Sequence, residues 1–341
     1  MTGTSGEAAD GGMSPLHRLR ERAKRSRHHI VLSEGEDPRV QDAARRAVAE
    51  GLADITLLGD AARIDVTGVR VETPGRDRLG PTVDAYKHAR AKKAPTDEQA
   101  TEAAADPLVH AALMVRAGAA DGTIGGAVRT TGDTVRAALQ MIGTAPDAPM
   151  VSSFFLMVLP DHHPDRPGAG LIFSDCGLVV DPSAEELSVI ARQAAGSAQA
   201  LLGVEPRVAL LSFSTRGSAS HDRVAKVTDA LARLADAPFA VDGELQFDAA
   251  MDPGVGGSKA PGSAVAGRAN VMIFPNLDAG NIGYKIAQRI GGATAVGPVL
   301  QGLAKPANDL SRGCTAEDIV DMIAVPSAQI DAMGTSEDSA S

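Results

Sequence analysis

Residues 301–318, QGLAKPANDLSRGCTAED, bring several chemically active side chains together within one short stretch. They offer a hydroxyl at Ser311, a guanidinium at Arg312, a thiol at Cys314 and a carboxylate at Asp318. Glycines and a proline indicate a shaped loop, and a threonine three residues before Asp318 is typical of a helix start. The N-terminus of a helix favours anions, because its N–H groups are free and its dipole is positive there. An ordinary loop followed by a capped helix is the competing interpretation.

A second candidate anion site lies in residues 122–144, GTIGGAVRTTGDTVRAALQMIGT. Glycines follow a short apolar run, and Thr130 and Thr131 precede a helical pattern that has Arg136 in its first turns. Backbone N–H groups, hydroxyl donors and a fixed cation together suit a phosphate or a carboxylate. The pattern is neither a Walker A loop nor a dinucleotide fingerprint, and a mere tight turn is the alternative.

Neither the cysteines nor the histidines indicate a metal site. Cys176 and Cys314 are the only cysteines, without metal-like spacing, and Cys176 ends an apolar run as an inert core thiol would. His162 and His163 lie in a proline-flanked turn with no cluster of other ligands, which favours a solvated turn. We therefore expect no metal and no disulfide framework.

The composition narrows the classes of partner. The chain has 341 residues and a formal net charge of -10, which argues against a nucleic-acid surface. No apolar run is long enough to span a membrane, and the first residues do not resemble a signal peptide. We expect a cytoplasmic protein that binds neither nucleic acid nor membrane, in which anionic ligands meet local arginines.

Apolar periodicity predicts an α/β protein of two domains. The basic run 16–27 is read as the first helix of the domain, because its apolar face is too small to insert into a membrane. A strand, a helix and a strand over 29–58 form a βαβ unit and predict a parallel sheet. The predicted strands are 29–33, 54–58, 69–72, 151–159, 171–174, 208–212, 271–274 and 295–300, and the predicted helices are 16–27, 39–50, 84–93, 99–119 with a break at Pro107, 184–202, 223–234 and 282–290.

Several long motifs, in order, resemble the phosphate acetyl/butyryl transferase family. They are LSEGEDPRV, GGAVRTTGDTVRAALQ, VSSFFLM, VALLSFST, DGELQFDAA, KAPGSAVAGRANV, AGNIGYKIAQR and QGLAKPANDLSRGC, within residues 30–321. The resemblance implies two α/β domains of the isocitrate/isopropylmalate dehydrogenase-like type with a cleft between them, and a homodimer. It also implies a discontinuous first domain, 13–148 plus 297–333, around a second domain, 149–296, with tails at 1–12 and 334–341.

The resemblance implies an acyltransferase, which moves an acetyl group reversibly between acetyl phosphate and coenzyme A. Coenzyme A is then a substrate, and no cofactor is expected. Asp318 corresponds to the general base, Arg312 to the arginine that stabilises charge on the acyl oxygen, and Ser311 to the hydroxyl near the sulfur. Substrate-binding positions are implied at Arg90, Thr130, Thr131, Arg136 and Arg289.

The chain departs from the family pattern at Val179 and Val180, after Arg90, and at Pro326, which predicts a kinked or short last helix. Phosphate butyryltransferase activity and a non-catalytic acyl-CoA-sensing module are the alternative functions. Cys314 keeps a covalent acyl-enzyme as an alternative mechanism. The sequence also leaves open whether Asp318 faces the cleft or caps its own helix.

Overall fold

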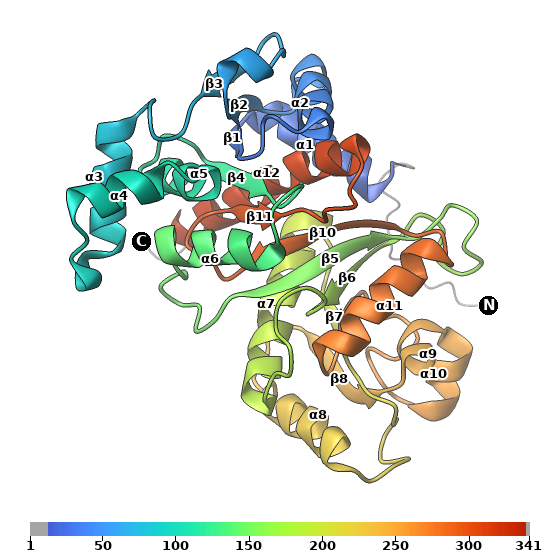
Figure 1. Ribbon diagram of the computed structural model, residues 1–341. Helices are drawn as coiled ribbons and strands as arrows, with labels where there is room; N and C mark the ends of the chain where they lie inside the picture. The colour runs from blue at the N-terminus through green and yellow to red at the C-terminus, as the bar shows by residue number, and fades with distance from the viewer. Residues whose placement is uncertain (1–12, 339–341) are drawn as a thin grey trace.

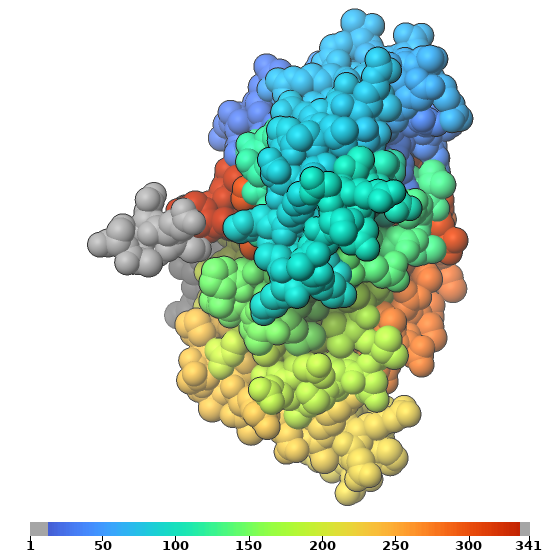
Figure 2. Space-filling view, turned by 60° about the vertical axis from the view of Figure 1, so that its left-hand side comes forward, coloured from blue at the N-terminus to red at the C-terminus, as the bar shows by residue number. Residues whose placement is uncertain are grey.

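The computed structural model describes residues 13–338. They form an α/β protein with two β-sheets and helices packed around each of them (Figure 1). In the space-filling view the blue and cyan segments stack above the yellow segments, and green segments lie between them (Figure 2). The predicted α/β fold is confirmed.

The first sheet is parallel throughout and has the strand order β11-β4-β1-β2-β3. Its registers place His29 opposite Asp54 and Ile30 opposite Gly122, so the predicted βαβ unit is confirmed. The strands are β1 (His29–Leu32), β2 (Asp54–Leu58), β3 (Arg70–Glu72), β4 (Gly122–Gly125) and β11 (Ala307–Asp309).

Two groups of helices cover this sheet. Helices α1 and α2 both pack on α12, and α3 to α6 form the other group. The break predicted at Pro107 is confirmed, because a new helix begins there with Asp106 as its cap. The helices are α1 (Pro15–Ser26), α2 (Pro38–Glu50), α3 (Leu79–Ala89), α4 (Asp97–Ala104), α5 (Pro107–Arg116), α6 (Thr131–Met141) and α12 (Ala316–Asp338), with 3-10 turns at Ala61–Arg63 and Ala91–Lys93.

The second sheet is mixed and has the strand order β10-β5-β6-β9-β7-β8. The pairs β10–β5 and β5–β6 are antiparallel, and the remaining pairs are parallel. Its strands are β5 (Ser152–Val158), β6 (Gly170–Ser174), β7 (Arg207–Leu211), β8 (Ala240–Leu245), β9 (Val271–Ile273) and β10 (Thr294–Gln301), and its helices are α7 (Ala184–Leu202), α8 (Asp222–Ala232), α9 (Phe247–Met251), α10 (Pro253–Lys259) and α11 (Leu277–Arg289).

The basic helix α1 packs on α12 through ion pairs. Arg20 donates to Asp321 Oδ1 from Nε at 2.9 Å and from Nη2 at 2.6 Å, and Arg22 Nε donates to Asp331 Oδ2 at 2.7 Å. Burial raises the pKa of Asp321, and the Arg20 guanidinium opposes that rise. Two arginines of the basic run 16–27 therefore pair with acids of α12. Within residues 13–338 no helix is long and apolar enough to cross a membrane.

The last helix differs from its prediction. α12 runs without interruption from Ala316 to Asp338 with Pro326 in its interior. Of the two predicted alternatives, the short helix was wrong, and the kink stays a prediction. Pro326 lies in a buried stretch, 319–328, whose packing outweighs the lost backbone hydrogen bond. Residues 334–338 of the predicted C-terminal tail belong to this helix, whereas residues 1–12 and 339–341 lie outside the described residues.

The chain passes from one sheet to the other at two adjacent segments. Thr144 bridges Leu303, Ala145 N donates to Gly302 O at 3.0 Å, and Ala304 N donates to Gly143 O at 3.0 Å. The domain boundaries 148/149 and 296/297 stay a prediction, although β10 continues in the second sheet to Gln301. Immediately after this crossing the chain forms β11 and the candidate catalytic loop.

The two glycines at this crossing form a matched pair for a stability test. Both have positive φ, but a Cβ on Gly302 would lie 2.4 Å from Met150 O, whereas one on Gly143 would meet nothing within 4 Å. We expect Gly143→Ala to cost about 1 kcal/mol in the free energy of unfolding, and Gly302→Ala about 1–3 kcal/mol more. Urea unfolding followed by circular dichroism measures both. Equal losses would show that crowding at Gly302 has no role.

Candidate active site

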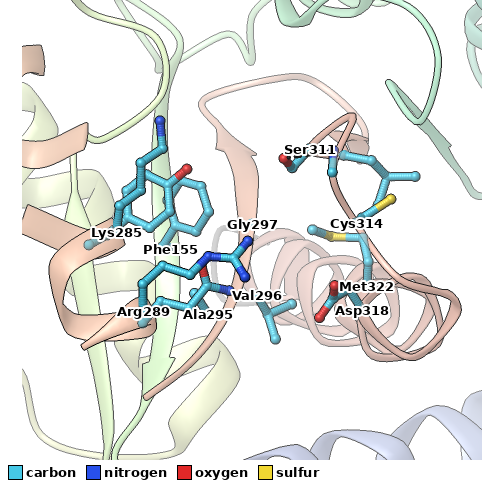
Figure 3. A pocket seen from close by; sticks show the side chains of 14 residues that line it. Phe155, Lys285, Arg289, Ala295, Val296, Gly297, Ser311, Cys314, Asp318 and Met322 are labelled. Atoms are coloured by element: carbon cyan, nitrogen blue, oxygen red, sulfur yellow. Dashed lines mark hydrogen bonds between the residues drawn. The ribbon is translucent and has the colours of Figure 1, made fainter. Parts of the chain in front are cut away.

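A pocket lies between α11 and the segment that joins β11 to α12 (Figure 3). One wall comes from the second sheet and α11, and the other from the loop 310–314 and the first turns of α12. The cavity has a volume of about 180 Å³. Its lining consists of Phe155, Tyr284, Lys285, Gln288, Arg289, Ala295, Val296, Gly297, Leu310, Ser311, Gly313, Cys314, Asp318 and Met322.

The catalytic loop, which we define as residues 310–314, follows β11 directly. Leu310 N donates to Gly125 O at 2.8 Å, which keeps the start of the loop on β4. Cys314 N donates to Ser311 O at 2.9 Å and closes a tight turn. Ser311 is exposed at the tip of this turn and lines the pocket. The strand and the turn together fix the position of its hydroxyl.

Asp318 is at once a helix cap and a wall of the pocket. Its Oδ2 accepts hydrogen bonds from Thr315 N at 2.8 Å and from Thr315 Oγ1 at 2.9 Å, and Asp318 N donates back to Thr315 Oγ1 at 3.2 Å. Oδ1 has no hydrogen-bond partner among residues 13–338, and the side chain lines the pocket (Figure 3). The two orientations left open by the sequence are therefore compatible, since each uses a different oxygen.

Cys314 is buried at the base of the same loop. Its side chain is 6% exposed, and burial raises the pKa of the thiol to about 11, against a lowering influence of Arg39. Only the thiolate is a good nucleophile, so this thiol is poorly suited to attack at neutral pH. Burial also raises the pKa of Cys176 well above its ordinary value.

The opposite wall of the pocket carries two cationic side chains next to a stacked aromatic pair. Lys285 and Arg289 lie four residues apart on α11, so their side chains share one helix face. Tyr284 stacks on Phe155 with a centroid separation of 3.9 Å, and Lys285 Nζ donates to Asn281 Oδ1 at 2.7 Å. The Arg289 guanidinium reaches toward the centre of the pocket and forms no ion pair within residues 13–338 (Figure 3).

Arg312 lies on the catalytic loop, but its side chain is not part of the pocket lining. The residue is exposed, and its guanidinium has no acceptor within the described chain. Its backbone carbonyl accepts a hydrogen bond from Arg39 Nη1 at 2.8 Å. Arg312 is thus a further cation on this loop, without an ion-pair partner among residues 13–338.

The candidate anion site at the start of α6 is satisfied within the chain. Thr130 caps the helix, accepting from Asp133 N at 3.2 Å and donating to Asp133 Oδ2 at 2.8 Å. Arg136 pairs with the same carboxylate at 2.8 Å. The glycine-rich loop, which we define as residues 125–129, offers backbone N–H groups, and those of residues 127–129 donate to the Glu34 carboxylate. The sequence suggested that these N–H groups bind an external anion. In the structure they bind the carboxylate of Glu34 instead.

Thr131 lies beside a buried carboxyl group at the end of β11. Burial raises the pKa of Asp309 to about 6, and the Thr131 and Thr134 hydroxyls oppose this rise. Neither oxygen of Asp309 has a well-aligned hydrogen-bond partner among the described residues. Arg90, at the end of α3, does not line the pocket, and α3 and α11 lie on opposite sides of Figure 1. The roles of Arg90, Thr130, Thr131 and Arg136 stay predictions.

Sequence reasoning missed several residues around the pocket. Lys285 could have been found from its helical spacing to Arg289 within AGNIGYKIAQR. Glu34 and Arg39 belong to the motif LSEGEDPRV, whose acidic turn gave no sign of its distant partners. No group of three or more histidines, cysteines and acids that could hold a metal ion occurs in residues 13–338.

Known proteins of similar sequence identify the family of this chain. Residues 14–326 match the family described as phosphate acetyl/butaryl transferase. The chain is 52% identical to a phosphate acetyltransferase of Paracoccus denitrificans over 93% of this chain and 99% of the relative. It is 46% identical to one of Thermoanaerobacterium thermosaccharolyticum over 93% of this chain and 99% of that protein.

Solved structures give the same result. The EutD phosphotransacetylase from Staphylococcus aureus superposes with a TM-score of 0.81 at 40% identity, covering 94% of this chain and all of that one (100%). A phosphotransacetylase from Streptococcus pyogenes superposes with a TM-score of 0.84 at 39% identity, covering 93% of this chain and 98% of the other. This chain belongs to the phosphate acetyl/butyryl transferase family.

Proposed function

We propose that this chain is an acyltransferase that moves an acetyl group reversibly between acetyl phosphate and coenzyme A, in the pocket between α11 and the catalytic loop. The observation that carries the proposal is that Ser311, Asp318 and Arg289 line one pocket. Relatives that are 42–52% identical over most of the chain bear the name phosphate acetyltransferase. No metal or cofactor enters the proposal.

Asp318 acts as the general base. A thiol with a pKa of about 8.5 is mostly protonated at neutral pH, so coenzyme A needs a base within reach. Thr315 orients one oxygen of Asp318 and leaves Oδ1 without a partner among residues 13–338. Oδ1 takes the thiol proton while the sulfur bonds to the acetyl carbon. The bond from that carbon to the phosphate oxygen then breaks, and phosphate leaves with the electron pair.

The arginines stabilise negative charge. Both substrates are anionic, whereas the chain has a formal net charge of -10, so binding requires cations that are not already neutralised. Arg289 lines the pocket, Arg312 extends from its loop, and neither forms an ion pair within the described residues. We assign Arg312 to the charge that develops on the acyl oxygen, and Ser311 to a hydrogen bond with the sulfur or the tetrahedral intermediate. Guanidinium geometry suits the phosphate oxygens as well.

The small volume of the pocket suggests that only the reacting parts of the two substrates enter it and that the rest of coenzyme A binds outside. A cavity of about 180 Å³ is smaller than the roughly 300–1,000 Å³ typical of sites for drug-sized ligands. It suits acetyl phosphate and the thiol end of coenzyme A, with the remainder of coenzyme A outside. We propose Arg90, Thr130, Thr131 and Arg136 as contacts for substrate groups outside this cavity. The Arg136 side chain is 63% exposed, and on binding it would exchange Asp133 for a substrate anion.

We also propose that the protein forms a homodimer and is located in the cytoplasm. Ile282, Ile286 and Ile290 repeat every four residues along α11, and their side chains are 57%, 52% and 83% exposed. An exposed apolar stripe of this kind is typical of a surface that is covered by a partner. Light scattering coupled to size-exclusion chromatography measures the mass in solution.

A thioester absorbance assay with acetyl phosphate and coenzyme A tests the activity. The expected result is thioester formation that depends on both substrates. If no product forms even when the enzyme concentration equals that of the substrates, catalysis is refuted and the acyl-CoA-sensing alternative is favoured.

The second candidate function is phosphate butyryltransferase, because the family includes both activities. A methylene changes selectivity by only about 1–3 kcal/mol, so kcat/KM for acetyl and butyryl phosphate must be compared directly.

Asp318→Asn should lower kcat by roughly 10² to 10⁴, because the amide cannot take the thiol proton. Its amide oxygen still accepts from Thr315 N, so the helix cap is retained. The control is Glu317→Gln, the same chemical change on the neighbouring exposed residue, which should leave kcat within about threefold. The thioester assay measures both variants, and a loss below about tenfold for Asp318→Asn would place the base elsewhere.

Cys314→Ala should keep at least about a tenth of wild-type kcat, because direct transfer in a ternary complex needs no protein nucleophile. Initial rates at varied concentrations of both substrates provide a second readout, with intersecting lines in double-reciprocal plots. Loss of nearly all activity together with parallel lines would instead indicate an acyl-enzyme on Cys314.

A further inference from the structure

Arg39 is the second residue of α2 and lies next to the catalytic loop and the glycine-rich loop. Its backbone N–H donates to Asp37 Oδ1 at 2.8 Å, and Pro38 occupies the first helical position. The start of the helix therefore fixes the backbone at Arg39 and the direction in which its side chain extends. The Arg39 side chain is 32% exposed, and that of Asp37 is 11% exposed.

The guanidinium of Arg39 uses each of its five N–H donors. Nε and Nη2 donate to the two oxygens of Asp37 at 3.0 Å and 2.8 Å, which fixes the plane of the group. Nη1 donates to Arg312 O at 2.8 Å and to Cys314 O at 3.0 Å. Nη2 also donates to Ala127 O at 2.8 Å. One side chain thus joins carbonyls of the catalytic loop to a carbonyl of the glycine-rich loop.

Glu34, from the turn that precedes α2, binds the glycine-rich loop through groups of the opposite polarity. Its carboxylate accepts from the N–H groups of Ala127 at 2.6 Å, Val128 at 3.1 Å and Arg129 at 2.7 Å. The glycine-rich loop is therefore held at its N–H groups by Glu34 and at one carbonyl by Arg39. Loops outside regular structure leave such groups unpaired, and charged partners make stronger bonds to them than neutral ones.

We propose that Arg39 is a positioning residue, which fixes the backbone of the catalytic loop and thereby the placement of Ser311 and Arg312 in the pocket. This inference rests on the proposed function for its catalytic consequence, but the contacts themselves do not depend on it. Arg39 does not line the pocket, so it acts through the loop and not on the substrate. A misplacement of about 1 Å in a site can cost about 10²-fold in rate, which makes such a restraint worth measuring.

A lysine cannot reproduce this arrangement. The ammonium group is a compact charge with three donors, whereas the contacts of Arg39 require a planar fork that serves two loops and Asp37 together. The Arg39→Lys variant separates the effect of the charge from the effect of the fork. Arg39→Gln removes the charge as well, and Arg45→Gln, on an exposed arginine of the same helix, is the matched control.

The experiment measures thiol labelling and steady-state kinetics on the same full-length variants. N-ethylmaleimide labelling is followed by peptide mass spectrometry, which separates the only two cysteines of the chain, Cys314 and Cys176. Cys176 is fully buried and reports general loosening, whereas Cys314 lies on the restrained loop. Burial raises the pKa of the Cys314 thiol and Arg39 lowers it, so loss of the cation alone would slow labelling. Faster labelling therefore reports exposure of the loop.

We expect Arg39→Lys and Arg39→Gln to label at Cys314 at least about tenfold faster than wild type, with Cys176 unchanged. In both variants kcat should fall about 10- to 100-fold, while KM for each substrate stays within about threefold. Arg45→Gln should match wild type in both measurements. This combination of results would support the positioning role.

Three results would overturn the inference. The first is a wild-type kcat in Arg39→Lys, since charge alone would then suffice. The second is equal acceleration at both cysteines, which would make Arg39 a general support of the fold. The third is unchanged labelling of Cys314. If the wild-type protein forms no thioester, the proposed function fails, and labelling still reports whether Arg39 holds the loop.

Discussion

The packing of α12 against α7 determines how the two sheets face each other. Buried residues of α12, among them Ile319, Ile323 and Val325, belong to one apolar core with alanines of α7, including Ala191 and Ala194. Small side chains on α7 allow a close approach, and each fully buried large apolar side chain contributes roughly 1.5–3 kcal/mol. Since the catalytic loop leads directly into α12, this packing also anchors the helix that carries Asp318 into the pocket.

Some arginines of the chain pair with carboxylates, and others, including Arg289 and Arg312, form no ion pair within residues 13–338. Arg20 and Arg22 pair with acids of α12, and Arg39 pairs with Asp37. Arginines that already have carboxylate partners serve to hold helices and loops together. Those near the pocket without one among the described residues are available to anionic substrates, because no internal carboxylate competes for them.

The local elements could be predicted from the sequence, because periodicity and caps are local signals. Residues 184–202 were predicted as a helix and are α7, and the break at Pro107 was correct. The short strands β8 and β11 were missed, since three to six residues carry little periodic signal and depend on sheet neighbours. Residues 316–338 form one helix through Pro326, because burial of residues 319–328 outweighs the local penalty.

The sequence by itself determined the family, the types of side chain near the reaction, and the helix start that holds Asp318. Only the tertiary structure decided which of these residues meet, because the pocket joins segments such as 284–289 and 310–318 that are distant in the chain. It also decided that Glu34 occupies the N–H groups of the glycine-rich loop and that Arg39 restrains the catalytic loop. Those partners depend on the three-dimensional crossing of strands and loops, and no local pattern carries that information.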